Sequence, residues 1–134
     1  MTYPQPSLGN DGDTAKTLPR VLIAEDEFLL AYMLEEDLRA EGFAVVGPYT
    51  RLADALEAAT NENFDIAVLD INMNGEMAFP IADVLVTRSI PFIFLSGYGN
   101  TTLPERLTGV PCIGKPCEPG ILLVELKRLL SARH

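Results

Sequence analysis

Acidic, hydroxyl and ammonium side chains that could carry out chemistry together follow apolar stretches of this sequence. The set consists of the acidic run Glu25-Asp26-Glu27, then Asp70, Ser96 and Lys115. Each of these polar residues follows an apolar stretch of about four residues, either directly or within a few positions. A hydroxyl and an ammonium group can donate hydrogen bonds to a phosphoryl group as its charge spreads over three oxygens. The set therefore predicts a site that places a phosphoryl group on a carboxylate.

The positions of these residues favour one shared pocket and a bound cation. In an open, mostly parallel sheet, ligands bind beyond the carboxyl ends of the strands, where the strand order reverses. Two or three carboxylates in a small pocket repel one another unless a divalent cation neutralises them. Mg²⁺ suits an all-oxygen site and keeps waters that phosphate oxygens can replace. Pairing of the acidic run with Asp70 therefore predicts a Mg²⁺ site.

Each of these residues also has a plain structural explanation when it is taken alone. A strand-end residue such as Asp70 often caps the next turn, and the acidic run could cap a helix N-terminus. Ser96 could be an ordinary turn residue before Gly97. Lys115 is less expected as a free surface lysine after a buried strand, and the proline that follows it favours a cis bond that aims the ammonium inward.

Apolar periodicity places the polar residues on alternating strands and helices. Strands are predicted over residues 20–24, 43–47, 65–69 and 110–113, with a further strand that begins after Pro91. Amphipathic helices are predicted after the first two strands, from Pro80 and from Pro119, and residues 72–76 are predicted to form a loop. Residues 97–109 hold too many turn formers for a long helix. This alternation predicts βαβ units and a parallel sheet, an α/β fold.

The last predicted helix is apolar over more of its surface than one sheet face requires. Ile121, Leu123 and Val124 widen the stripe formed by Leu122, Leu126, Leu129 and Leu130. A partner surface and simple deep burial both explain this width.

Composition and charge limit the classes of function. With 134 residues that are 48% hydrophobic, the chain can bury one core, so we expect a tail over residues 1–18 and one domain over residues 19–134. The net charge is −9 without a cluster of basic residues, which makes nucleic acid and anionic membranes poor partners. The apolar runs are strand-sized and no secretory signal is recognisable, so a cytoplasmic location is expected.

The counts of cysteine and histidine exclude further chemistry. Cys112 and Cys117 are too few for a disulfide framework, and reduced thiols are expected. The only histidine is His134, the last residue, which disfavours a phosphohistidine, a Ser-His-Asp triad and a histidine-based metal site. A phosphoryl carrier in this chain should therefore be a carboxylate.

The order of these motifs resembles the receiver domain of two-component response regulators. The likeness covers about residues 19–133 and rests on the acidic run, on Asp70, on Ser96-Gly97 and on Lys115-Pro116. The stretches from Asp70 to Glu76 and from Phe94 to Gly99 further resemble the stand-alone subgroup called FAT GUY receivers. The resemblance implies a flavodoxin-like (CheY-like), doubly wound, five-stranded parallel sheet in the order 2-1-3-4-5, with a short or irregular fourth helix.

The resemblance also implies a role for each site residue. Asp70 would accept the phosphoryl group, while Ser96 and Lys115 would bind it. Mg²⁺ would be held by Asp26 and Asp70 directly, by Glu25 through water and by the carbonyl of Asn72. The implied mechanism is in-line transfer from a phosphohistidine of a histidine kinase or a phosphotransfer protein, followed by hydrolysis of the acyl phosphate. Asn72 and Tyr98 lie where the family tunes access of water to that bond.

Several positions depart from the family pattern. The proline usual four residues after the acceptor is Asn74 here, and the glycine usual at the start of the third helix is Ala78, with Gly75 earlier. An aromatic residue is usual where Cys112 stands. A cysteine cannot act as a swinging ring, so we expect the switch to work through residues 97–109.

Three functions compete at this point. The first is a stand-alone phosphorylatable switch, not an enzyme acting on other substrates, whose output is contact with an unknown protein target. The second is a phosphate sink or phosphorelay intermediate with the same chemistry. The third is a phosphatase of the haloacid dehalogenase type, which needs a second acid where this chain has Asn72. One sequence does not identify the kinase or the target. It also leaves open whether the chain forms a homodimer and whether it is a truncated piece of a longer regulator.

Overall fold

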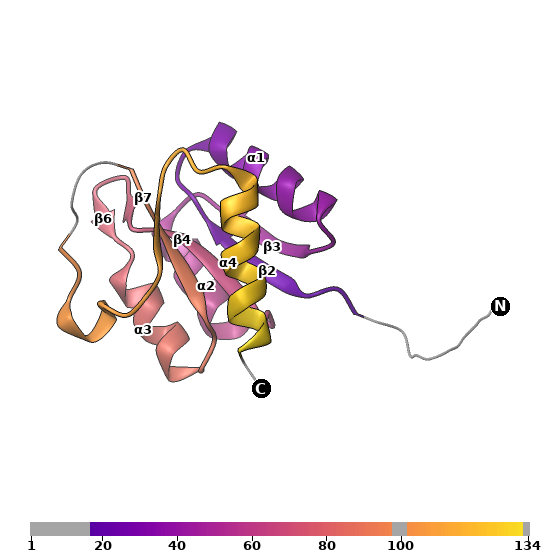
Figure 1. Ribbon diagram of the computed structural model, residues 1–134. Coiled ribbons are helices and arrows are strands. Elements are labelled where there is room, and N and C mark those ends of the chain that lie inside the picture. The colour runs from indigo at the N-terminus through magenta and orange to yellow at the C-terminus, as the bar shows by residue number, and fades with distance from the viewer. Residues whose placement is uncertain (1–16, 98–101, 133–134) are drawn as a thin grey trace.

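Five parallel strands form the central sheet of the computed structural model, which describes residues 17–97 and 102–132 (Figure 1). The strands are β2 (Arg20–Ala24), β3 (Ala44–Tyr49), β4 (Ile66–Asp70), β7 (Phe92–Ser96) and β8 (Cys112–Gly114). Their order in the sheet is β3-β2-β4-β7-β8, and all neighbours pair in parallel. Counted along the chain, this is the order 2-1-3-4-5, so the predicted flavodoxin-like topology is confirmed.

In the described part of the chain, four α-helices cover the two faces of this sheet. They are α1 (Phe28–Ala40), α2 (Leu52–Asn61), α3 (Phe79–Thr87) and α4 (Pro119–Ser131). Buried side chains of α2 and α3 share one core cluster, and those of α1 and α4 share the other. Helix α1 ends before Gly42, whose φ of 94° turns the chain back into β3. The doubly wound arrangement follows from right-handed βαβ connections.

The central strands β2, β4 and β7 are apolar except for one polar end residue each, because both faces of the sheet are covered. In β2, Val21 and Ile23 belong to the cluster on the α1 and α4 side, whereas Leu22 and Ala24 belong to the cluster on the α2 and α3 side. All four are fully buried. Burial of one large aliphatic side chain contributes about 1.5–3 kcal/mol, so these short strands fix the sheet in one register.

The loop predicted at residues 72–76 is wrong, because this segment forms a small antiparallel hairpin. Its strands are β5 (Asn72–Met73) and β6 (Glu76–Met77). The turn between them consists of Asn74 with a φ of 56° and Gly75 with a φ of 88°. Positive φ at both central residues is the type I′ geometry that two-residue hairpins prefer, and Asn-Gly is its strongest sequence signal.

β2 has its predicted bounds, whereas the bounds of β3, β4 and β8 differ from the predicted ones by one to two residues. β3 runs on to Tyr49, past a cis Gly47–Pro48 bond, instead of ending at Gly47. Proline is tolerated there because β3 is an edge strand. β4 includes Asp70, so the carboxylate belongs to the last residue of the strand.

The segment before β8 holds the predicted short helix, a 3₁₀ turn named η1 (Glu105–Leu107). Leu107 is buried in the core, and the Arg106 guanidinium donates two hydrogen bonds, 2.8 and 2.9 Å long, to the Asp83 carboxylate on α3. Residues 98–101, with Tyr98 among them, lie outside the described residues. The interpretation that residues 97–109 carry the switch stays a prediction.

Three further predictions concern the N-terminal tail, the apolar surface of the last helix and segments that could span a membrane. The predicted tail lies outside the described residues up to residue 16, and Leu18 precedes β2 as an exposed residue. Deep burial is wrong for Ile121 and Val124 on α4, whose exposed fractions are 55% and 69%. Among the described residues, no helix combines the length and apolar character needed to cross a membrane.

Candidate functional site

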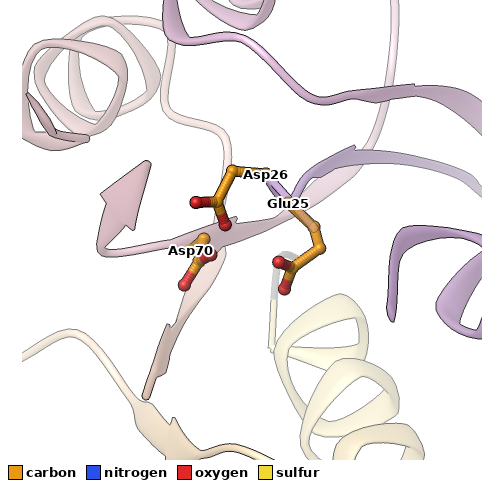
Figure 2. Close-up of side chains that lie close together, drawn as sticks. All are labelled: Glu25, Asp26 and Asp70. Carbon is orange, nitrogen blue, oxygen red and sulfur yellow. The ribbon is translucent and has the colours of Figure 1, made fainter. Parts of the chain in front are cut away.

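Three carboxylates meet at the carboxyl ends of two neighbouring strands. Glu25 and Asp26 directly follow β2, and Asp70 is the last residue of β4. One oxygen from each carboxylate lies within 4.8 Å of the others. The close-up in Figure 2 shows the three side chains gathered at this point. Glu25 and Asp70 have exposed fractions of only 0% and 2%, and Asp26 is half-buried. The strand order thus assembles the acidic cluster that the sequence predicted.

An ammonium group lies between two of these carboxylates. Lys115 follows β8, and its Nζ donates hydrogen bonds to Oδ2 of Asp70 at 3.0 Å and to Oε1 of Glu25 at 3.2 Å. The Lys115 side chain is only 17% exposed, so both bonds form largely away from solvent. The predicted cis bond between Lys115 and Pro116 is present. Lys115 therefore neutralises part of the negative charge of the cluster.

The crowded carboxylates have unusual affinities for protons. Burial, followed by the Asp26 carboxylate beside it, raises the pKa of Asp70 to about 8 against the opposing effect of Lys115. Burial also works to raise the pKa of Asp26, but hydrogen bonds with the Asp70 side chain, the Asn74 backbone and the Glu25 side chain lower it overall. Burial alone would lower the pKa of Lys115, yet its contacts with Asp70 and Glu25 raise that pKa.

The cluster opens into a cavity of about 840 Å³ at the surface. Its lining includes Asp26, Asp70, Asn72, Gly97 and Lys115. Ser96 is half-buried at the end of β7, and its backbone carbonyl accepts the amide hydrogen of Lys115 at 2.7 Å. The structure therefore brings the predicted site residues to one edge of the sheet, with Ser96 next to the cavity wall.

The plain explanation of the acidic run as a helix cap accounts for little of its geometry. Glu27 is the N-cap residue of α1 and makes no side-chain capping bond. Glu25 instead points inward, where it accepts the amide hydrogen of Glu27 at 3.0 Å and the two bonds from Lys115. These donors satisfy the buried carboxylate of Glu25, which a position at a helix cap would not require.

The site also contains two residues to which the sequence analysis gave no role in the site. Asn74 and Gly75 line the cavity, and the Asn74 amide donates to the Asp26 carboxylate. The Asn-Gly pair was the signal that could have predicted the turn placing them there.

The two thiols do not contribute to this chemistry. Cys112 is exposed, Cys117 is half-buried, and both are free. Burial raises the pKa of each thiol, which keeps it protonated and weakly nucleophilic.

The donor set fits a hard divalent cation. Three carboxylates offer oxygen atoms within 4.8 Å of one another, and Asn72 lines the same cavity. Mg²⁺ binds such sites through one or two carboxylates and retains waters. Burial, followed by the neighbouring Asp26 and then Glu25, raises the pKa of Asp70, and a bound cation would favour the charged form of this carboxylate.

Fold and site together define a doubly wound α/β protein with an acidic, lysine-bearing site at its topological switch point. The chain belongs to the response regulator receiver domain family, whose sequence profile matches residues 21–127. The finer assignment to the FAT GUY subgroup stays a prediction.

Several known proteins resemble the chain. The transcriptional regulatory protein PdtaR of Mycobacterium tuberculosis is 33% identical over 100 residues, which cover 73% of this chain and 49% of that protein. The solution structure of SdrG from Sphingomonas melonis Fr1 is 35% identical with a TM-score of 0.74 and covers 84% of this chain and 97% of that one. A CheY-like receiver from Methanospirillum hungatei JF-1 shares the fold at 24% identity and a TM-score of 0.76, covering 87% and 97%.

The curated relatives are longer than this chain. The chain spans about half the length of the curated relatives that it matches. Several of them are named transcriptional regulatory proteins, so the absence of a nucleic-acid partner stays a prediction.

The acidic cluster predicts how stability depends on pH when no metal is bound. The pKa of Asp70 is about 8 in the folded state and lies near 3.8 ordinarily. Between these values the folded state binds more protons than the unfolded state, so the free energy of unfolding should fall as pH rises from about 4 to 8. Asp70→Asn should remove this contribution and raise the free energy of unfolding at pH 8 by roughly 2 kcal/mol or more.

Urea unfolding at a series of pH values in the presence of a chelator measures this dependence. Asp54→Asn, a change at an exposed carboxylate on α2, is the matched control and should follow the wild-type curve. Parallel curves for wild type and Asp70→Asn would show that burial of Asp70 has no such cost.

Proposed function

We propose that this chain is a phosphorylatable switch that accepts a phosphoryl group on Asp70 and signals by phosphorylation-dependent contact with a protein target. The donor would be a phosphohistidine of a histidine kinase or phosphotransfer protein in the cytoplasm. One observation carries the proposal: the buried carboxylate of Asp70 lies 3.0 Å from the Lys115 ammonium at the wall of an open cavity. Membership of the receiver family supports it.

The transfer step uses the groups that surround Asp70. A carboxylate oxygen of Asp70 attacks phosphorus while the bond from phosphorus to the imidazole nitrogen of the donor breaks. Lys115 lies where its ammonium can pair with a phosphoryl oxygen, and Ser96 lies at the adjacent strand end to donate from its hydroxyl. Mg²⁺ held by Asp26, Asp70, the Asn72 carbonyl and, through water, Glu25 would supply charge that lowers the repulsion between carboxylate and phosphate. The later hydrolysis of the acyl phosphate would regenerate Asp70.

The surface beside the cavity supports a protein donor. Glu27 and Leu30 of the α1 region line the cavity, so the helix begins at its rim. Phe28, Leu29 and Tyr32 on this helix have exposed fractions of 78%, 65% and 58%. A cluster of large exposed apolar side chains is typical of a protein interaction surface. A donor protein bound there would bring its histidine close to Asp70.

Phosphorylation can be tested without the natural donor. Wild-type protein is incubated with acetyl phosphate and Mg²⁺, and the intact mass is measured. A gain of one phosphoryl group that requires Mg²⁺ and is reversed by hydroxylamine, which cleaves acyl phosphates, is the expected result. A chelator-insensitive or hydroxylamine-resistant adduct would contradict a carboxylate acceptor that works with a cation.

Asp26→Asn should weaken cation binding and phosphorylation together. The change removes one of the carboxylates that we assign as direct ligands, and an amide oxygen carries no full charge. We expect Mg²⁺ affinity to fall by at least about 10-fold, or about 1.4 kcal/mol. Titration calorimetry measures the affinity, and labelling at several Mg²⁺ concentrations measures the reaction. Glu27→Gln, at the exposed neighbouring acid, is the control; equal losses in both variants would mean that only the net charge matters.

A further inference from the structure

The hairpin after Asp70 directs one backbone amide at the acidic cluster. The Asn74 N–H donates to Oδ2 of Asp26 at 3.0 Å, across 48 residues of sequence. We propose that Asn74 is a positioning residue, whose backbone amide holds the Asp26 carboxylate in the orientation that binds the divalent cation. This inference rests on the proposed cation site and assigns a residue that supports it.

The hairpin can hold the amide in place because it is fastened at several points. Met73 is only 1% exposed and packs into the core cluster on the α2 and α3 side. The Gly75 N–H donates to Oδ1 of Asn72 at 2.7 Å, and the Ala78 N–H donates to the carbonyl of Ile71 at 2.7 Å. The amide of Asn74 is therefore presented by a turn that is anchored to the core.

The residue type at position 74 matters because of the backbone conformation. Asn74 has a φ of 56°, which asparagine and glycine adopt far more readily than other residues. Proline is the residue usual at this position in the receiver family. Its φ is fixed near −65°, and it carries no N–H. The asparagine therefore gives this chain a hydrogen bond to Asp26 that a proline could not form.

The bond restrains the orientation of the Asp26 carboxylate. A carboxylate has two oxygens, and fixing Oδ2 with a charge-assisted bond limits rotation of the group. The cluster is tight, with one oxygen of each carboxylate within 4.8 Å of the others, so a rotated Asp26 would alter the distances that a small cation requires. Groups that orient metal ligands typically change metal affinity by about 10–100-fold when they are removed.

The test compares three proteins by Mg²⁺ titration, followed through backbone amide signals in NMR spectra. Asn74→Pro removes the N–H and cannot adopt the positive φ, whereas the conservative variant Asn74→Gly retains both. We expect Asn74→Pro to bind Mg²⁺ about 10-fold more weakly than wild type and Asn74→Gly to bind it within about twofold. Equal affinity of wild type and a folded Asn74→Pro, or equal losses in both variants, would overturn the inference.

A second measurement keeps the inference testable if Asn74→Pro does not fold. Hydrogen exchange of the Asn74 amide is measured in metal-free wild type and in Asp26→Ala, and loss of the acceptor should speed exchange at this amide. Unchanged exchange would overturn the inference. Failure of the wild type itself to bind Mg²⁺ would instead contradict the proposed function, so the two failures are distinguishable.

Discussion

Replacing Asp70 with asparagine is expected to abolish phosphoryl labelling by acetyl phosphate and binding of beryllofluoride in the presence of Mg²⁺. The amide has almost the same size, so it should occupy the same buried position at the end of β4. Its oxygen is a poor nucleophile and carries no full negative charge, so neither the acyl phosphate nor its beryllium analogue can form. Lys115 keeps its second partner, Glu25, so the fold of the pocket should survive.

Intact-mass measurement with Asp54→Asn as the matched control gives the readout. The control changes an exposed carboxylate on α2 and should be labelled like the wild type. Labelling of Asp70→Asn at the wild-type level would place the acceptor elsewhere and remove the central proposal. Partial labelling would show that a second carboxylate of the cluster substitutes for Asp70.

The fold could be predicted because its strands are short and apolar on both faces. The runs that became β2, β4 and β7 are each closed by polar residues, so the ends of the strands were readable. Parallel strands bring those ends to one edge of the sheet. For this reason the sequence alone predicts that Asp26, Asp70 and Lys115 lie in one site.

Other features depend on contacts between distant residues and could not be predicted. Lys115 and Glu25 are 90 residues apart, and their bond exists because β8 and β2 both end at this pocket. The family resemblance implied that Glu25 contacts a cation through water, but it did not indicate that the Glu25 carboxylate also accepts hydrogen bonds from Lys115 and the Glu27 amide. The Asn74 bond to Asp26 was missed because it arises from backbone geometry, which carries no side-chain signature.

Lys115→Met should have the second large effect, because Lys115 links two carboxylates that are almost fully buried. Removal of one partner leaves Glu25 and Asp70 without their ammonium, which should lower the free energy of unfolding by about 3 kcal/mol at pH 9. The loss should shrink toward pH 6, because Asp70, with a pKa of about 8 that the lysine holds down, can then take up a proton. Labelling by acetyl phosphate should slow by about 100-fold, since one donor to the phosphoryl group is lost.

Lys127→Met is the matched control, since Lys127 is an exposed lysine on α4. Urea unfolding with and without Mg²⁺ then separates two roles of Lys115. The ammonium and the cation neutralise the same carboxylates, so Mg²⁺ should stabilise Lys115→Met more than it stabilises the wild type. Equal stabilisation of both proteins would mean that the two positive charges act on separate sites. The larger response expected for Lys115→Met would identify the Lys115 ammonium as the charge that stabilises the carboxylate cluster in metal-free protein.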